Sequence, residues 1–428
     1  MTLAFLGYSG RTRLGAALRE LEIAQNNLGA VHALIACAWL FSFGIGRAPE
    51  GILFGALIGI SLLRIPRTAA LLAEALKACG PVLACMGLLL LIGISAAWSP
   101  IEANPDWYPP RHILYPVLLA PLLGRWRLLV WSYLLGLVFQ ASWILIEYVL
   151  VKDYQYGYPL GSSSNVHFWG GPMAVASILA ACLLFDASGG RGPRIAALLS
   201  WLVCMSAAFV IAGRTTSIAM LAGLLTAGAW TAVRARLSWK VPAIAFACTV
   251  LCWLAFGTTL TSRFQQKMGD SSTASLRTRL HAFTSARTWM WETTLPSWQA
   301  HPIAGWGRDA WAVVFRERIQ ALPKEELLRP VGQLQHLNTA HNTYIQALVD
   351  QGAMGLTLVM LSLTSLAVHS WRSTSINGAM LAGICSYWAI SGCMLSELNT
   401  SHGLVPFGIM MILALGITVD APRSQFTS

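Results

Sequence analysis

The chain has 428 residues, of which 56% are hydrophobic and only 11% are charged, and its net charge is +11. Soluble globular proteins contain about 25% charged residues, so this composition excludes a disordered chain, a coiled coil and an ordinary soluble enzyme, and it predicts a polytopic membrane protein. The basic excess does not indicate nucleic-acid binding, because the basic residues are scattered singly between apolar runs and no basic run is interleaved with aromatic residues in the way that binds nucleic acid.

In chain order, residues 1–27 are polar and lack the apolar core of a signal peptide, which predicts a cytoplasmic N-terminal segment. Twelve apolar runs follow, which we interpret as membrane-spanning helices although several are shorter than the ~20 residues of a full crossing. The runs cover residues 28–46, 51–65, 81–98, 112–124, 128–150, 169–186, 195–213, 216–233, 241–260, 352–369, 378–396 and 403–419. We expect the tail over 420–428 to be cytoplasmic.

The distribution of basic residues predicts the orientation of these helices. With the N-terminus in the cytoplasm, the cytoplasmic segments, including a break at Arg125 and Arg127, hold 15 Lys and Arg residues, whereas the short outer loops hold 4. Because Lys and Arg favour the cytoplasmic side of short loops, we place helices 1–9 over 28–260, a large outer loop over 261–351, and helices 10–12 over 352–419.

The outer loop is the one long polar part of the chain. Its apolar spacing predicts a helix over 272–299 and a second helix over 308–321, with a turn at Pro302 and Gly305–Gly307 between them. We see no convincing strand pattern. The expected fold class is therefore all-α, with about twelve transmembrane helices and one large, mainly helical outer loop.

A single arginine beside this loop and a group of three arginines within it are candidates for binding an anion. Arg214 lies in a break of a few residues between two apolar runs, so it either snorkels to lipid headgroups or holds a phosphate. Arg277, Arg279 and Arg287 lie within eleven residues of one another. They either form a solvated face or bind a diphosphate, whose oxygens accept bidentate hydrogen bonds from guanidinium groups.

His341 is the candidate base. It opens an amphipathic stretch that ends at Asp350–Gly352, and we expect it in the first helical turn, where the macrodipole disfavours the charged imidazole. A neutral imidazole can act as a general base near neutral pH; a structural polar histidine is the alternative. No phosphate-binding glycine loop, dinucleotide fingerprint or Asp-rich cluster is present in the sequence, so we expect neither metal nor cofactor.

Together these residues resemble the O-antigen ligase family of bacterial envelope glycosyltransferases, which also contains O-antigen polymerases and protein O-oligosaccharyltransferases. The family pattern is His, then Asn, Ser or Gln, then nine residues, then Gly-x-x-Gly, Thr or Tyr, and His341-Asn342 with Gly352–Gly355 satisfies it. Further family features are an Arg four residues before a Trp, a His-Pro pair, a Gly-x-Gly and a Gly-Arg-Thr junction. They are matched by Arg287 and Trp291, His301-Pro302, Gly305-Trp306-Gly307 and Gly213-Arg214-Thr215.

The resemblance implies a GT-C-like fold in the inner membrane of a Gram-negative bacterium, with an active site that faces the periplasm. It implies inverting, metal-independent transfer of a glycan from undecaprenyl pyrophosphate to a sugar hydroxyl of lipid A–core. His341 would accept or orient the proton of the acceptor hydroxyl, and Arg214 and Arg287 would neutralise the departing pyrophosphate. Substrate contacts are expected from Arg277, Arg279, Asn342, Trp291, His301 and Trp306. We interpret Gly352 and Gly355 as structural, because glycines three apart on one helix face permit close packing.

Three other functions remain open. An O-antigen polymerase shares the helices and the loop but usually lacks the full match to the His-Asn and glycine pattern. A pilin-directed oligosaccharyltransferase shares the motif but commonly carries a larger soluble C-terminal region. A lipid-linked glycan transporter is the non-enzyme alternative, and it predicts intramembrane charges and inverted repeats, which the sequence does not display.

Overall fold

The computed structural model describes residues 27–64, 73, 79–100, 111–150, 167–186, 190–211, 214–234, 247, 281, 284, 286–323, 337–396 and 401–420. All regular structure within these ranges is helical, with no strand, in agreement with the predicted all-α class. The predicted helix over 241–260 and the arginines Arg277 and Arg279 lie outside the described residues, as do both ends of the chain.

The described helices follow the predicted apolar runs. Before the polar segment they are the helix Asn27–Ser42, α2 (Arg47–Leu62), α4 (Gly80–Ile94) with the 3-10 helix η1 (Ser95–Trp98), α6 (Leu114–Leu119), η2 (Ala120–Arg125), α7 (Trp126–Leu150), α8 (His167–Phe185), α9 (Arg191–Ile211) and α10 (Arg214–Arg234). After it come α16 (Thr343–Arg372), α17 (Ile376–Ser391) and α18 (Ser401–Asp420).

The boundary between the fourth and fifth predicted helices differs from the expectation. In place of a loop at Arg125 and Arg127, the 3-10 helix η2 joins α6 directly to α7, so the chain is helical from Leu114 to Leu150. Pro121 explains the change of helix type, because proline cannot donate the backbone hydrogen bond of an α-helix interior but is compatible with the start of a new helix.

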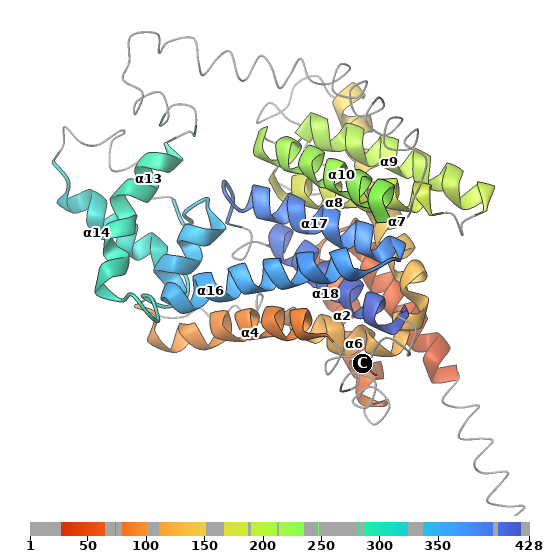
Figure 1. Ribbon diagram of the computed structural model, residues 1–428, viewed down its shortest axis with the longest axis horizontal. Coiled ribbons are helices and arrows are strands. Elements are labelled where there is room, and N and C mark those ends of the chain that lie inside the picture. The colour runs from red at the N-terminus through yellow and green to blue at the C-terminus, as the bar shows by residue number, and fades with distance from the viewer. Residues whose placement is uncertain are drawn as a thin grey trace, which may run out of the picture.

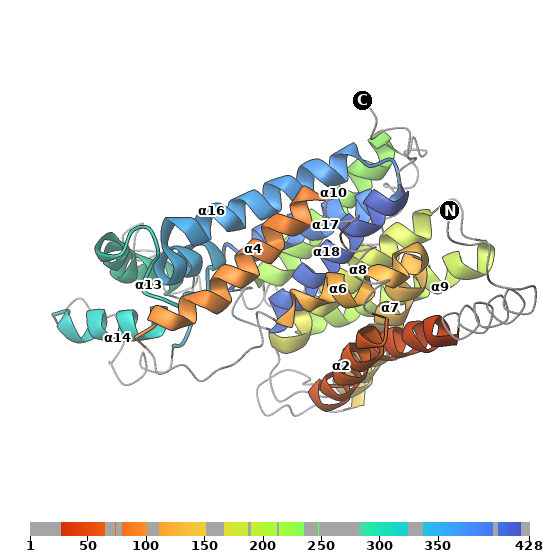
Figure 2. The same cartoon turned by 90° about the horizontal axis from the view of Figure 1, so that it is seen from below.

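Five of the described helices are long and apolar enough to cross a membrane. They are Gly80–Trp98, Leu114–Leu150, Arg191–Ile211, Thr215–Arg234 and Thr343–Arg372, and four shorter apolar helices accompany them. The chain is therefore a multi-pass membrane protein, and the count of twelve helices and their orientation stay predictions. In Figures 1 and 2, α4 and α16 run side by side along one flank of the bundle.

The polar segment folds at one end of this bundle. It contains α13 (Arg287–Thr294), the 3-10 helix η3 (Leu295–Ala300) and α14 (Trp311–Ala321), which lie beyond the ends of α4 and α16 (Figure 1). It has a hydrophobic core separate from that of the bundle. That core is formed by Trp289, Met290, Trp311, Ala312, Phe315, Ile319, Ala340 and Val349.

The predicted helix over 308–321 and the turn before it are confirmed, whereas the predicted helix over 272–299 is wrong in its extent. Ala286 has a φ of 71°, which breaks a right-handed helix, so α13 begins only at Arg287. Helical structure then continues through η3 to Ala300. The residues at 272–280 lie outside the described part of the chain.

Candidate active site

A break in α16 organises the site. Gly352 has φ 69° and ψ −161°, so α16 consists of a first part over 343–351 and a longer apolar part after the break. This arrangement corrects the expectation that Gly352 and Gly355 share one face of a continuous helix. The break occurs where the amphipathic stretch meets the apolar run, so it lets the first part leave the direction of the membrane helix.

The turn over 301–307 pairs with the backbone that the break exposes. The Trp306 and Gly307 amides donate to the Val349 and Asp350 carbonyls at 2.9 and 2.8 Å. In the opposite direction, the Ala353 amide donates to the Pro302 carbonyl at 2.8 Å and the Met354 amide to the Ile303 carbonyl at 3.2 Å. The His-Pro and Gly-x-Gly motifs therefore supply hydrogen-bond partners that a broken helix would otherwise lack.

Gly352 permits this pairing for two physical reasons. Its φ of 69° combined with its ψ of −161° belongs to a region that is essentially restricted to glycine. A Cβ at this position would also collide with the Ile303 carbonyl and the Gly305 amide. The close approach of the turn and the break is thus possible only without a side chain at 352.

We expect Gly352→Ala to destabilise the protein by about 1–3 kcal/mol through backbone strain alone, with the collision adding to this loss. The unfolding midpoint of the detergent-solubilised protein measures the effect. Gly87→Ala in α4 is the matched control, because a Cβ there meets nothing within 4 Å. An equal shift of the unfolding midpoint in the two variants would show that the backbone at 352 can rearrange without loss of stability.

The segment after His341 is bound to the end of α17. Asn342 is the N-cap of α16: its Oδ1 accepts from the Tyr344 and Ile345 amides, and its Nδ2 donates to the Cys393 carbonyl at 2.9 Å. The Thr343 amide donates to the Gly392 carbonyl at 2.7 Å. The Asn342 amide is thus engaged in capping, and its predicted contact with substrate stays a prediction.

His341 lies before this cap and not in the first helical turn, which corrects the expected effect of the macrodipole. Its φ is 49°, a left-handed conformation that is uncommon for a residue with a side chain. The other described non-glycine residues with positive φ are Ala286, directly before Arg287, and Asp309. Such conformations persist only where surrounding contacts impose them, and they are concentrated at functional sites.

Contacts on both sides of Ala340 impose the conformation at His341. The Ala340 carbonyl accepts from Trp291 Nε1 at 2.7 Å, and the Ala340 amide donates to Gln346 Oε1 at 2.7 Å. Ala340 is fully buried, whereas His341 is partly exposed. The peptide before His341 is therefore held between α13 and α16, and the cap after it is held on α17.

Asp350 completes this network. Its Oδ2 accepts from Gln346 Nε2 at 2.7 Å, and its Oδ1 accepts from the Trp311 amide at 2.9 Å. Asp350 is fully buried, and its carboxylate faces the first turn of α14. A chain of hydrogen bonds thus runs from α14 through Asp350 and Gln346 to the peptide before His341.

Arg287 and Trp291 both belong to the part of α13 that faces this peptide. They are four residues apart, so they share one face of the helix. Trp291 Nε1 reaches the Ala340 carbonyl, and Arg287 lies one helical turn before Trp291. The structure thus links Trp291 directly to the peptide before His341.

The start of α10 lies at the same end of the bundle as the turn after α17. Close contacts show that α10 and α17 run antiparallel: Gly223 with Tyr387, Ala227 with Gly383, and Trp230 with Gly378. Arg214 is the first residue of α10, so its backbone lies toward the end of α17 that binds Asn342 and Thr343. The Arg214 side chain lies outside the described residues.

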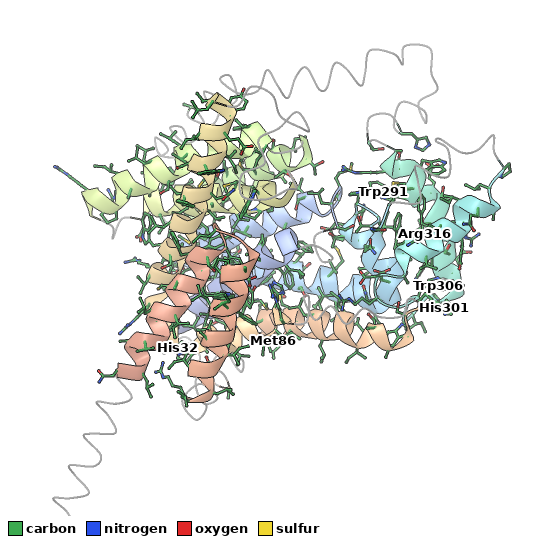
Figure 3. All side chains as sticks on the ribbon, turned by 180° about the vertical axis from the view of Figure 1, so that it is seen from behind. His32, Met86, Trp291, His301, Trp306 and Arg316 are labelled. Carbon is green, nitrogen blue, oxygen red and sulfur yellow. The ribbon has the colours of Figure 1, made fainter. Side chains whose placement is uncertain are left out.

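His301 and Trp306 lie away from Trp291, next to the end of α4 (Figure 3). Their rings pack edge to face with centroids 4.3 Å apart, and Trp306 Nε1 donates to the Ser297 carbonyl at 2.9 Å.

A surface pocket of about 430 Å³ lies on α13 and η3. It is lined by Glu292, Leu295, Pro296, Trp298 and Gln299, none of which was a predicted site residue.

Gln346 and Asp350 were not predicted as site residues from the sequence. Their spacing of four residues on an amphipathic stretch places them on one helix face, which is the signal that could have identified the pair.

Within the described ranges, no three His, Cys, Asp or Glu side chains come together as a metal site would require.

The fold and this site define a multi-pass membrane protein with polar candidate residues gathered at one end of its helix bundle. Residues 198–360 match the family model described as O-antigen ligase, and the match contains Arg214, Arg287, Trp291 and His341. This part of the chain is similar to the O-antigen ligase family, whose members are glycosyltransferase-like enzymes that act as ligases or polymerases. The predicted resemblance is thus confirmed. No curated protein matches the chain.

Proposed function

We propose that this protein is an O-antigen ligase. It transfers a glycan from undecaprenyl pyrophosphate to a sugar hydroxyl of lipid A–core, at the periplasmic face of the inner membrane, with inversion and without a metal ion. The supporting observation is the rigid support of the peptide before His341, which joins the helix of Arg287 to the network of Gln346 and Asp350.

In this reaction the acceptor hydroxyl oxygen attacks the anomeric carbon of the donor glycan. The bond between that carbon and the pyrophosphate oxygen breaks, and its electron pair leaves with undecaprenyl pyrophosphate. The proton of the hydroxyl passes to the His341 imidazole as the new glycosidic bond forms. Inversion follows, because the acceptor and the leaving group occupy opposite faces of the sugar.

The arginines act on the leaving group. Negative charge grows on the pyrophosphate oxygens as the bond breaks, and guanidinium groups stabilise such charge through bidentate hydrogen bonds. We assign this role to Arg287 and Arg214. Both residues begin helices, α13 and α10, and the N-terminal dipole of each helix adds positive potential near its own arginine. Arg277 and Arg279 are further candidates for the donor phosphates.

A transfer assay with purified protein in chelator-treated proteoliposomes tests the function. It supplies undecaprenyl-pyrophosphate glycan and lipid A–core, and it measures glycosylated lipid A–core and released undecaprenyl pyrophosphate. A polymerase would instead lengthen the donor glycan, and an oligosaccharyltransferase would react only after a pilin is added. Movement of the donor across the bilayer without release of pyrophosphate would show a transporter and contradict the proposal.

We expect Arg287→Lys to lower kcat/KM roughly tenfold or more, because a point charge does not reproduce a bidentate guanidinium contact. The steady-state rate in the same assay measures the loss. Arg316→Lys is the matched control, since the Arg316 guanidinium donates to the Ala312 carbonyl of its own helix, α14. Normal turnover of the Arg287 variant would remove this residue from the leaving-group site.

A further inference from the structure

Three exposed apolar side chains surround the turn that pairs with the α16 break. Ile303 is 66% exposed, Met354 is 43% exposed and Trp98 is 39% exposed. The Ile303 carbonyl accepts from the Met354 amide at 3.2 Å, and Trp98 Nε1 donates to the Ala304 carbonyl at 3.3 Å. These bonds hold the turn between the end of η1 and the first turn of α16 after the break. We call the three side chains the Ile303 surface.

Two members of the Ile303 surface, Trp98 and Met354, belong to the candidate membrane spans Gly80–Trp98 and Thr343–Arg372, which carry further exposed apolar side chains. On α4, Leu90 and Ile94 are 53% and 52% exposed; on α16, Met360 and Leu361 are 49% and 51% exposed. Both helices are long and apolar enough to cross a membrane, so we expect lipid to cover these faces. Figures 1 and 2 show the two helices side by side, and Figure 3 places His301 next to the end of α4.

We propose that the Ile303 surface inserts into the interfacial layer of the bilayer and anchors the folded polar segment to the membrane. Trp98 ends a spanning helix, the position at which tryptophan is enriched at membrane interfaces. Ile303 belongs to the polar segment, yet its backbone is bonded at the level where the apolar part of α16 begins. An apolar side chain exposed at this depth is stabilised by lipid and not by water.

This contact has a geometric consequence. The same turn donates to the Val349 and Asp350 carbonyls, so the bilayer contact is rigidly connected to the first part of α16 and to the network that supports His341. The Ile303 surface therefore sets the height of the polar segment above the membrane. This inference concerns where the segment sits, and it holds whether or not the transfer reaction proposed above is correct.

Depth-dependent quenching tests the proposal in the full chain. A genetically encoded environment-sensitive fluorescent amino acid replaces Ile303, and the protein is reconstituted in phosphatidylcholine vesicles that contain lipids brominated near the headgroup or deep in the acyl chain. The matched control carries the same amino acid in place of Gln320, an exposed residue of α14. Avoiding cysteine labelling is necessary because the chain has nine cysteines.

We expect several-fold stronger quenching at 303 than at 320, greatest with bromine near the headgroup and without any added polyprenyl substrate. Equal quenching at the two positions would overturn the proposal. Quenching at 303 that depends on added polyprenyl donor would also overturn it, since the surface would then bind substrate. A measurement on the unsubstituted protein guards against misfolding: photoactivatable lipids should label the peptides around Trp98, Ile303 and Met354 more than those of α14.

Discussion

Replacing His341 with alanine is expected to lower the rate of glycan transfer by about 10²–10⁴-fold, the typical contribution of a positioned general base. The loss should appear in kcat more than in KM, because the imidazole acts on the proton that moves in the transition state. The reconstituted assay with lipid-linked glycan and lipid A–core measures it. The hydrogen bonds of Ala340 and Asn342 do not involve the imidazole, so we expect the substitution to leave them in place.

His341→Asn is the control that separates chemistry from backbone strain. Asparagine adopts a positive φ more readily than alanine does, so this variant preserves the conformation at 341 while it removes the imidazole. Both variants should unfold near the wild-type midpoint, and both should show the loss of transfer rate of about 10²–10⁴-fold. Wild-type turnover of His341→Asn would show that the imidazole is dispensable and that His341 has a structural role.

The apolar runs predicted most of the fold because the membrane constrains sequence strongly. A spanning segment must satisfy its backbone hydrogen bonds internally and present apolar side chains to lipid, so α4, α7, α9 and α16 are evident as long apolar runs. The junction at η2 was not predictable from hydropathy. There the chain stays helical from α6 through η2 to α7, and only the type of helix changes at Pro121.

The polar segment was harder to predict because its shape depends on backbone conformations that composition does not reveal. The positive φ of Ala286 shortens α13, and the positive φ of His341 places the histidine before α16. Neither residue type is one from which a left-handed conformation would be predicted. These conformations are imposed by tertiary contacts, such as the bond from Trp291 to Ala340. The motif glycines were more informative, since Gly305, Gly307 and Gly352 all have positive φ where the turn meets the break.

The candidate residues were recognisable as types, but their support was not. Arginine beside the membrane and histidine before an amphipathic stretch were visible in the sequence. The buried pair Gln346 and Asp350 looked like ordinary polar residues of a helix. Only the structure shows that their hydrogen bonds end at the peptide before His341, which makes them candidates for positioning residues.

Asp350→Asn is expected to reduce both the stability of the protein and the transfer rate. In the native network Asp350 Oδ2 accepts from Gln346 Nε2, while Gln346 Oε1 accepts from the Ala340 amide. An asparagine can still accept from the Trp311 amide, but its Nδ2 then faces the donor of Gln346. If the Gln346 amide rotates, its Oε1 can accept from the asparagine Nδ2. Its Nε2 then faces the Ala340 amide, so two donors meet at Ala340 instead. A buried donor without an acceptor destabilises by about 1–3 kcal/mol.

Adding Gln346→Glu to Asp350→Asn should restore much of this loss. The new carboxylate can accept from both the asparagine Nδ2 and the Ala340 amide, and the double variant carries the same net charge as the wild type. Gln346→Glu alone should destabilise the protein more than Asp350→Asn or the double variant does, because it places two carboxylates side by side in a fully buried position. The unfolding midpoint and the transfer rate of all four proteins form a double-mutant cycle. Additive losses would show that the two residues act independently, whereas recovery in the double variant would show that the direction of this hydrogen-bond chain holds His341 in place.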